Sequence, residues 1–139
     1  MSWVVYAFLS AFFAALVAVF GKIGLARIDP TLGAAVRGVI MALFMIGAVV
    51  ALKKFDPAVF ASTPREWFFI TLAAAAGALS WLFYFVALKD GPASGVAAID
   101  RLSIILVIVL AVLALGEKFS WLKLAGAALI AMGAVLVAW

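Results

Sequence analysis

The sequence predicts an all-α integral membrane protein, a bundle of five transmembrane helices. Hydrophobic residues make up 71% of the 139 residues, and the mean hydropathy is +1.38. Soluble domains contain about 45–50% apolar residues, so a soluble fold would lack the polar surface needed to cover these runs. The apolar residues fall into five runs, each about as long as a helix that crosses a ~30 Å hydrocarbon layer. The predicted spans are residues 3–21, 32–52, 67–88, 94–115 and 121–139.

Helices are favoured over a β-barrel because barrel strands alternate apolar and polar residues, and these runs do not. Short polar segments, most of them with Gly or Pro, separate the spans at residues 24–30, 53–66, 89–92 and 116–120. We therefore expect one five-helix domain over residues 1–139. The first span is expected to be retained, because no basic residue precedes it and it is longer than a signal-peptide core.

Composition excludes several classes of chemistry. Cysteine and histidine are absent, which removes disulfides, thiolate sites and the usual metal ligands. We expect no metal, no cofactor and no catalytic residues, so the protein is not predicted to be an enzyme. The net charge of +4 comes mostly from residues that flank the apolar spans. These residues are interpreted as membrane anchors rather than as a nucleic-acid surface.

An odd number of spans places the two termini on opposite faces of the membrane. Counting Lys and Arg near the span ends gives five on one face against three on the other, or five against five with Arg37 and Arg101 included. The positive-inside rule thus favours a cytoplasmic N-terminus only by a small margin, and insertion in both orientations stays open. The five on the first face are Lys53, Lys54, Arg65, Lys118 and Lys123.

Three charged residues lie inside apolar runs: Arg37 in the second, and Asp100 and Arg101 in the fourth. An unpaired charge in hydrocarbon costs several kcal/mol, so each needs a partner, a wet cavity or a path to the headgroups. The alternation of spans places them in the same leaflet, together with Lys22 and Tyr84. A polar cavity that contacts a substrate is one interpretation. A salt bridge between Arg37 and Asp100 that only locks two helices is the other.

Weaker patterns of small, polar or aromatic residues occur on three other predicted helices. Small or polar residues recur every four positions along the first span, and Ser80, Trp81 and Tyr84 share one face of the third. Both stripes fit either a cavity lining or close helix packing. Gly126 and Gly133 form a smooth strip on the fifth span and are the predicted dimer interface. The stripe on the first span is Tyr6, Ser10, Ala14, Ala18 and Lys22.

The chain resembles one five-helix repeat of the EamA-like drug/metabolite transporters. The resemblance covers nearly the whole chain and rests on residues 20–25, Pro30 with Arg37, residues 84–89, and residues 115–118 followed by the two glycines of the fifth span. It implies transport of small metabolites. Many members contain two repeats of opposite orientation, whereas this chain has one, so the resemblance implies that two copies pair.

A second departure from the longer relatives lies in the fourth span. Residues 99–103 carry charge where longer relatives commonly have an apolar segment with proline. The small multidrug resistance branch is similar in size, but it carries an essential acidic residue in its first helix, and residues 3–21 contain none. A cation/proton antiporter of that kind is therefore disfavoured.

We therefore predict a secondary transporter of small anionic or zwitterionic metabolites in a prokaryotic inner membrane. It would act as a homodimer, in antiparallel arrangement if both orientations insert, by alternating access. A translocator of lipids or lipid-linked headgroups and a non-transporting membrane scaffold are the alternatives. The predicted substrate site comprises Tyr6, Ser10, Lys22, Arg37, Ser80, Trp81, Tyr84, Asp100, Arg101 and Ser103.

Overall fold

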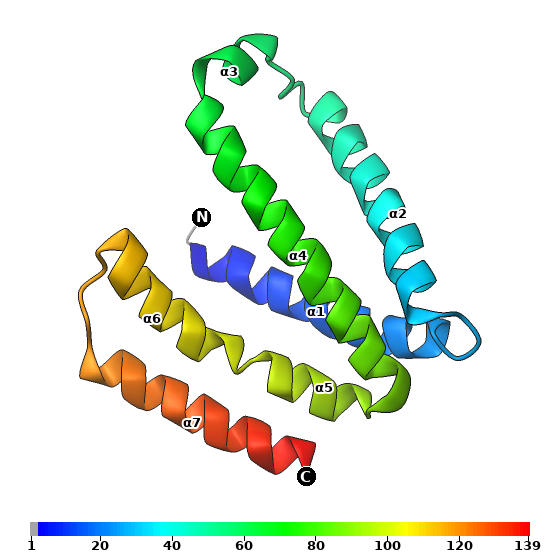
Figure 1. Ribbon diagram of the computed structural model, residues 1–139, viewed down its shortest axis with the longest axis vertical. Coiled ribbons are helices and arrows are strands. Elements are labelled where there is room, and N and C mark those ends of the chain that lie inside the picture. Colours follow the sequence, from blue (N-terminus) through cyan, green and yellow to red (C-terminus); the bar gives the residue numbers. More distant parts are fainter. Residues whose placement is uncertain (1–2) are drawn as a thin grey trace. The chain divides into compact units, whose positions relative to one another are not determined.

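The computed structural model describes residues 3–139, apart from the side chains of residues 60–62, and every regular element in that part of the chain is an α-helix (Figure 1). Five helical segments are long and apolar enough to cross a membrane. The predicted fold class is therefore confirmed. The five are α1 (Trp3–Gly24), α2 (Pro30–Ala51), α4 (Pro64–Asp90), the pair α5 (Ala93–Asp100) and α6 (Ser103–Leu115), and α7 (Trp121–Ala138).

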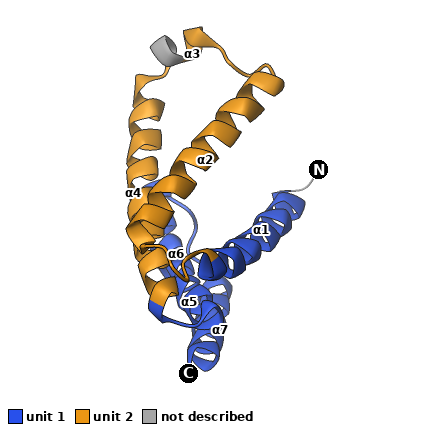
Figure 2. Ribbon diagram, turned by 90° about the vertical axis from the view of Figure 1, so that its right-hand side faces the viewer, with its two compact units in different colours: residues 1–23, 90–139 blue, residues 24–89 orange. Residues whose placement is uncertain are grey.

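The chain forms two compact units, coloured separately in Figure 2. Unit 1 comprises residues 1–23 and 90–139, and unit 2 comprises residues 24–89. The expectation of one domain over the whole chain stays a prediction.

Unit 2 begins with a capped helix. The Asp29 carboxylate accepts hydrogen bonds from the backbone N–H groups of Thr31 (2.9 Å) and Leu32 (3.1 Å). Pro30 follows as the first helical residue, where its missing N–H costs nothing and its fixed φ suits the helix. As a result α2 starts two residues earlier than predicted.

The end of α2 shows a Schellman motif with lysine in the position that glycine usually takes. Lys53 has φ +52°, in the left-handed region. Its N–H bonds the Val50 carbonyl, and the N–H of Lys54 bonds the Val49 carbonyl, both at 3.0 Å. These are the two bonds of the motif, which satisfy carbonyls that the helix end leaves free.

The loop after α2 contains a short helix that the sequence did not predict. Asp56 caps α3 (Pro57–Ser62) by accepting a hydrogen bond from the Ala58 N–H at 3.0 Å. α4 then begins at Pro64, again with proline as its first residue, so it starts three residues before the predicted span. Within unit 2, α2 and α4 converge towards the start of α2 and separate towards α3 (Figures 1 and 2).

In unit 1 the fourth span is interrupted. The predicted continuous helix ends at Asp100 and resumes at Ser103. Across the gap the N–H groups of Arg101 and Leu102 bond the carbonyls of Ala98 and Ile99, three residues back instead of four. The interruption is therefore a tightened 3₁₀-type turn, and it contains neither proline nor glycine.

The last helix of unit 1 packs through small residues. α7 contacts both α5 and α6, and its buried residues are Ala127 and Ala134. A Cβ added to the buried Gly95 of α5 would lie 3.5 Å from the Ala138 Cα, so α5 and α7 approach at backbone distance. Alanine and glycine permit this approach, which replaces the hydrophobic drive that helices lack in lipid.

Candidate functional site

Arg37 is the charged residue most clearly placed by the structure. It lies seven residues after Pro30, about 10 Å along α2, and is half-buried. Its guanidinium carbon lies over the Trp81 ring, 3.9 Å from the ring centroid. The same atom is 5.5 Å from the centroid of the Phe85 ring. Both rings belong to α4, one turn apart, so unit 2 brings Arg37 and Trp81 together as a candidate site.

The two rings stabilise the Arg37 charge only in part. A cation within about 6 Å of an aromatic centroid gains up to about 2 kcal/mol when it is desolvated. The unpaired charge in hydrocarbon costs several kcal/mol. Among the described residues the guanidinium makes no hydrogen bond and no ion pair. Its donors are thus available to a ligand.

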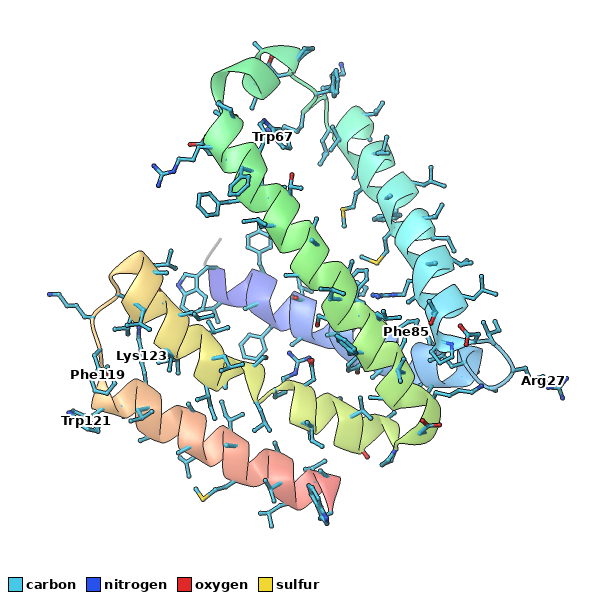
Figure 3. The ribbon with its side chains drawn as sticks, viewed as in Figure 1. Arg27, Trp67, Phe85, Phe119, Trp121 and Lys123 are labelled. Atoms are coloured by element: carbon cyan, nitrogen blue, oxygen red, sulfur yellow. The ribbon has the colours of Figure 1, made fainter. Side chains whose placement is uncertain are left out.

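A small packed core lies next to the cluster formed by Arg37, Trp81 and Phe85. Phe85 is only 4% exposed and Leu25, in the loop after α1, is 3% exposed. A Cβ built on Gly33, one turn before Arg37, would lie 2.9 Å from a Leu25 methyl carbon and 3.8 Å from a Phe85 ring carbon. Glycine at position 33 therefore makes the room that Leu25 occupies against α2 and α4 (Figure 3, where Phe85 is labelled).

Lys89, near the end of α4, fixes the loop that supplies Leu25. Its ammonium donates to the Leu25 carbonyl at 2.5 Å and to the carbonyls of Ala26 and Ile28, both at 3.3 Å. A cation also suits the negative end of the α4 dipole. The sequence offered Lys89 only as a flanking anchor. Its position in the last turn of a helix, before a Gly-Pro turn, was the available signal.

The other predicted residues of unit 2 lie beside the cluster. Tyr84 is half-buried and Ser80 is exposed. Both are sequence neighbours of cluster residues on α4. Their substrate roles stay predictions.

The six predicted site residues of unit 1 are presented differently. Lys22 donates a hydrogen bond of 2.9 Å to the Gly91 carbonyl, so its ammonium has a structural partner in the turn before α5. Asp100 and Arg101 are exposed at the interruption of the fourth span, and neither forms an ion pair within the described part of unit 1. Tyr6, Ser10 and Ser103 are exposed as well. Grouping any of these residues with Arg37 in one site stays a prediction, as does the Arg37–Asp100 salt bridge.

The glycines of the predicted dimer interface are open on α7. A Cβ added to Gly126 or to Gly133 would meet no atom within 4 Å. The adjacent Ala127 and Ala134 are the residues buried against unit 1. The glycine strip thus has space for the backbone of another helix, and its role as a dimer interface stays a prediction.

Unit 1 also contains an apolar groove of about 190 Å³ between α6 and α7. Phe119, in the loop after α6, is among its lining residues, and the Phe119 ring makes an edge contact with the Trp121 ring, with the centroids 5.1 Å apart (both labelled in Figure 3). No charged or polar side chain lines the groove, so it lacks the groups that would orient a polar metabolite. Its lining residues are Ile105, Ile108, Val109, Val112, Leu113, Phe119, Leu124 and Ala127.

Five helices that are long and apolar enough to cross a membrane define the class, a polytopic membrane protein. The chain belongs to the EamA-like transporter family, which matches residues 1–139. The predicted resemblance is thereby confirmed, and the protein is a membrane transporter. A Sinorhizobium sp. protein named "Uncharacterized transporter in cobO 3'region" is 44% identical over 137 residues, which cover 99% of this chain and 96% of the relative. No solved structure matches the chain.

Proposed function

We propose that the protein is a secondary transporter of small anionic or zwitterionic metabolites and acts as a homodimer by alternating access. The observation that carries the proposal is Arg37, a cation inside a span whose guanidinium has aromatic neighbours but no counter-ion among the described residues. A negatively charged group on the substrate would supply the counter-ion that the described residues do not provide. Charged side chains inside membrane spans are most often functional for this reason.

The composition of the predicted site supports the same sign of charge. Lys22, Arg37 and Arg101 are cationic, and Asp100 is the one acidic member. A simple cation would add to an uncompensated positive charge in a low-dielectric setting. An anion or a zwitterion would reduce it.

Dimerisation is supported by the size of the matched unit. The Sinorhizobium relative is covered to 96% by a single five-helix unit. Alternating access commonly uses two inverted repeats, and a single repeat obtains the second from another copy. The open Gly126 and Gly133 strip is the proposed contact. The near-even distribution of Lys and Arg supports an antiparallel pair in a prokaryotic inner membrane.

The absence of cysteine makes the assembly directly testable. A single cysteine placed next to Gly133 should form cross-linked dimers in native membranes, and Gly133→Leu should abolish them without reducing expression. Gly47→Leu, another helical glycine with open space around it, is the matched control. Accessibility of a cysteine appended to the C-terminus from both sides of the membrane would support dual insertion, whereas labelling from one side only would reject the antiparallel arrangement.

Transport itself is tested by counterflow. Purified protein in liposomes is loaded with one unlabelled solute, and uptake of the labelled solute is followed across a panel of anionic, zwitterionic and cationic metabolites. The proposal expects stimulated uptake of an anion or zwitterion. Counterflow of cations alone, weakened by Asp100→Asn, would make the carboxylate the recognition group and reject the proposed substrate charge.

A further inference from the structure

We infer that Arg37 holds the carboxylate of a small monocarboxylic acid and that Trp81 positions the Arg37 guanidinium for this anion. The inference deepens the proposed function and rests on it for the physiological role of the bound acid. Its basis is the position of the guanidinium carbon over the Trp81 ring at 3.9 Å, with the Phe85 ring at 5.5 Å.

The Trp81 ring restricts how an anion can reach the guanidinium. At 3.9 Å no atom fits between the guanidinium carbon and the ring, so that side is closed. The N–H donors of a guanidinium lie in its own plane and form a fork that matches two oxygens of one group. A carboxylate bound along this edge would make two parallel charge-assisted hydrogen bonds. A phosphoryl group has the same ability, so geometry alone does not separate the two.

The charge of the ligand decides between a carboxylate and a phosphoryl group. The interior of unit 2 contains one charge, because Arg37 is the only charged residue of α2 and residues 67–88 of α4 carry none. A monocarboxylate would neutralise that charge. A phosphate monoester carries about −1.5 to −2 at neutral pH and would leave negative charge uncompensated in a low-dielectric environment. The carboxylate is therefore the favoured ligand.

Trp81 contributes to affinity by ordering the Arg37 side chain. A free arginine side chain loses rotamer entropy when it makes two defined hydrogen bonds to a ligand. Stacking on an aromatic face already restricts the side chain, so less rotamer entropy is lost on binding. Phe85 is farther from the guanidinium and lies in the packed core with Leu25 and Gly33. Trp81 is half-buried, and its replacement leaves that core intact. Loss of the indole should thus release the guanidinium without unfolding unit 2.

The experiment uses the indole as its own reporter. In the full-length protein in lipid nanodiscs, the other four of the five tryptophans are changed to Phe, so that emission comes from Trp81. The probes are acetate, butyrate and pyruvate, with butyramide, butylamine and ethyl phosphate as analogues of similar size. We expect a saturable change in emission with at least one monocarboxylate. The amide and the amine should produce none, and ethyl phosphate should bind about tenfold more weakly or worse.

Variants then separate recognition from structure, with calorimetry as the readout. Arg37→Lys keeps the charge but loses the fork, so carboxylate affinity should fall about tenfold or more. Trp81→Leu should also weaken carboxylate binding at an unchanged melting temperature, and Trp81→Phe, which keeps an aromatic face, should weaken it less, whereas Trp67→Leu on the same helix should leave the affinity unchanged. A merely structural Trp81 would instead lower the thermal stability together with the affinity.

Three results would overturn the inference: no saturable signal with any of the carboxylates, equal binding of butylamine, or unchanged carboxylate binding in Arg37→Ala. Counterflow keeps these failures apart from failure of the proposed function. A protein that transports a metabolite of the panel but binds no carboxylate refutes the role of Arg37 and Trp81 alone. A protein that binds carboxylates at Arg37 but transports nothing refutes the transport proposal instead.

Discussion

The two units use different contacts to hold their helices together. In unit 2 charged side chains add tertiary contacts to the packed core of Leu25 and Phe85: Lys89 bonds three loop carbonyls, and Arg37 lies over Trp81. In unit 1 a lysine also bonds a turn carbonyl, Lys22 on Gly91, but the α7 contacts with α5 and α6 come through small residues.

This difference indicates where a ligand can act. Helices in lipid gain nothing from apolar burial, so they associate through close packing or through polar contacts. A packed alanine has no group to offer a solute, whereas an arginine whose donors are unpaired does. The comparison therefore favours unit 2 for the proposed substrate recognition.

The largest effect should follow removal of the unpaired cation. Arg37→Ala should reduce counterflow at least about 100-fold, which corresponds to about 2.7 kcal/mol of lost substrate interaction. The protein should remain folded and inserted, because the packed core around Leu25 and Phe85 does not include the guanidinium. Arg65→Ala, at the exposed start of α4, is the control and should transport normally.

The Arg37→Ala result also decides between the two interpretations of the intramembrane charges. If Arg37 and Asp100 form a structural pair, Arg37→Ala should destabilise the protein, and adding Asp100→Asn should restore stability. If Arg37 binds substrate, the double variant should be as inactive as the single one. Normal transport by a well-folded Arg37→Ala protein would remove Arg37 from the site.

The next largest effect concerns the lysines that bond backbone carbonyls, one in each unit. Lys89→Met leaves the carbonyls of Leu25, Ala26 and Ile28 without their donor and should lower the unfolding free energy by about 2–3 kcal/mol. Lys22→Met removes the bond to the Gly91 carbonyl, and the loss of that bond should cost about 1 kcal/mol. Unfolding in mixed micelles with increasing dodecyl sulfate measures both. Equal losses would show that the contacts to Ala26 and Ile28 contribute nothing.

The sequence identified Arg37 and Trp81 separately but not as a pair. A charge inside an apolar run is visible in composition, and so are the five spans, because length and hydropathy decide both. The contact between Arg37 and Trp81 depends on the register of α2 against α4, which no local pattern specifies. The partners of Lys89 depend on the path of the loop after α1 for the same reason.

Local signals were missing elsewhere in the chain. The helix of the fourth span is interrupted after Asp100 without proline or glycine, so no residue in 99–103 predicts the interruption. The starts of α2 and α4 were placed too late because Pro30 and Pro64 were assigned to loops. Proline is favoured at a first helical position, and Asp29 before Pro30 was the signal that could have corrected the first of these.

A smaller effect should follow when the notch in unit 2, the space beside Gly33 that the Leu25 side chain occupies, is filled. Gly33→Val adds a branched side chain where a Cβ already lies 2.9 Å from the end of Leu25, so it should cost about 1–2 kcal/mol after the gain in helix propensity is deducted. Gly47→Val on the same helix meets open space and should be neutral or slightly stabilising. Thermal denaturation of the pair in detergent measures the difference. If Gly33→Val were as stable as Gly47→Val, Leu25 would not be held in the notch.

The smallest effect compares two helix ends that adopt the same left-handed backbone, with lysine in unit 2 and glycine in unit 1. Lys53 has φ +52° and Gly116 has φ +67°. A side chain in this region costs about 1 kcal/mol, and glycine avoids the cost. Lys53→Gly should therefore stabilise the protein by up to about 1 kcal/mol, and Gly116→Ala should destabilise it by about 1 kcal/mol. Lys54→Gly removes the same charge beside Lys53 without relieving a positive φ, so it should not stabilise; a gain equal to that of Lys53→Gly would attribute the effect to charge rather than to backbone conformation.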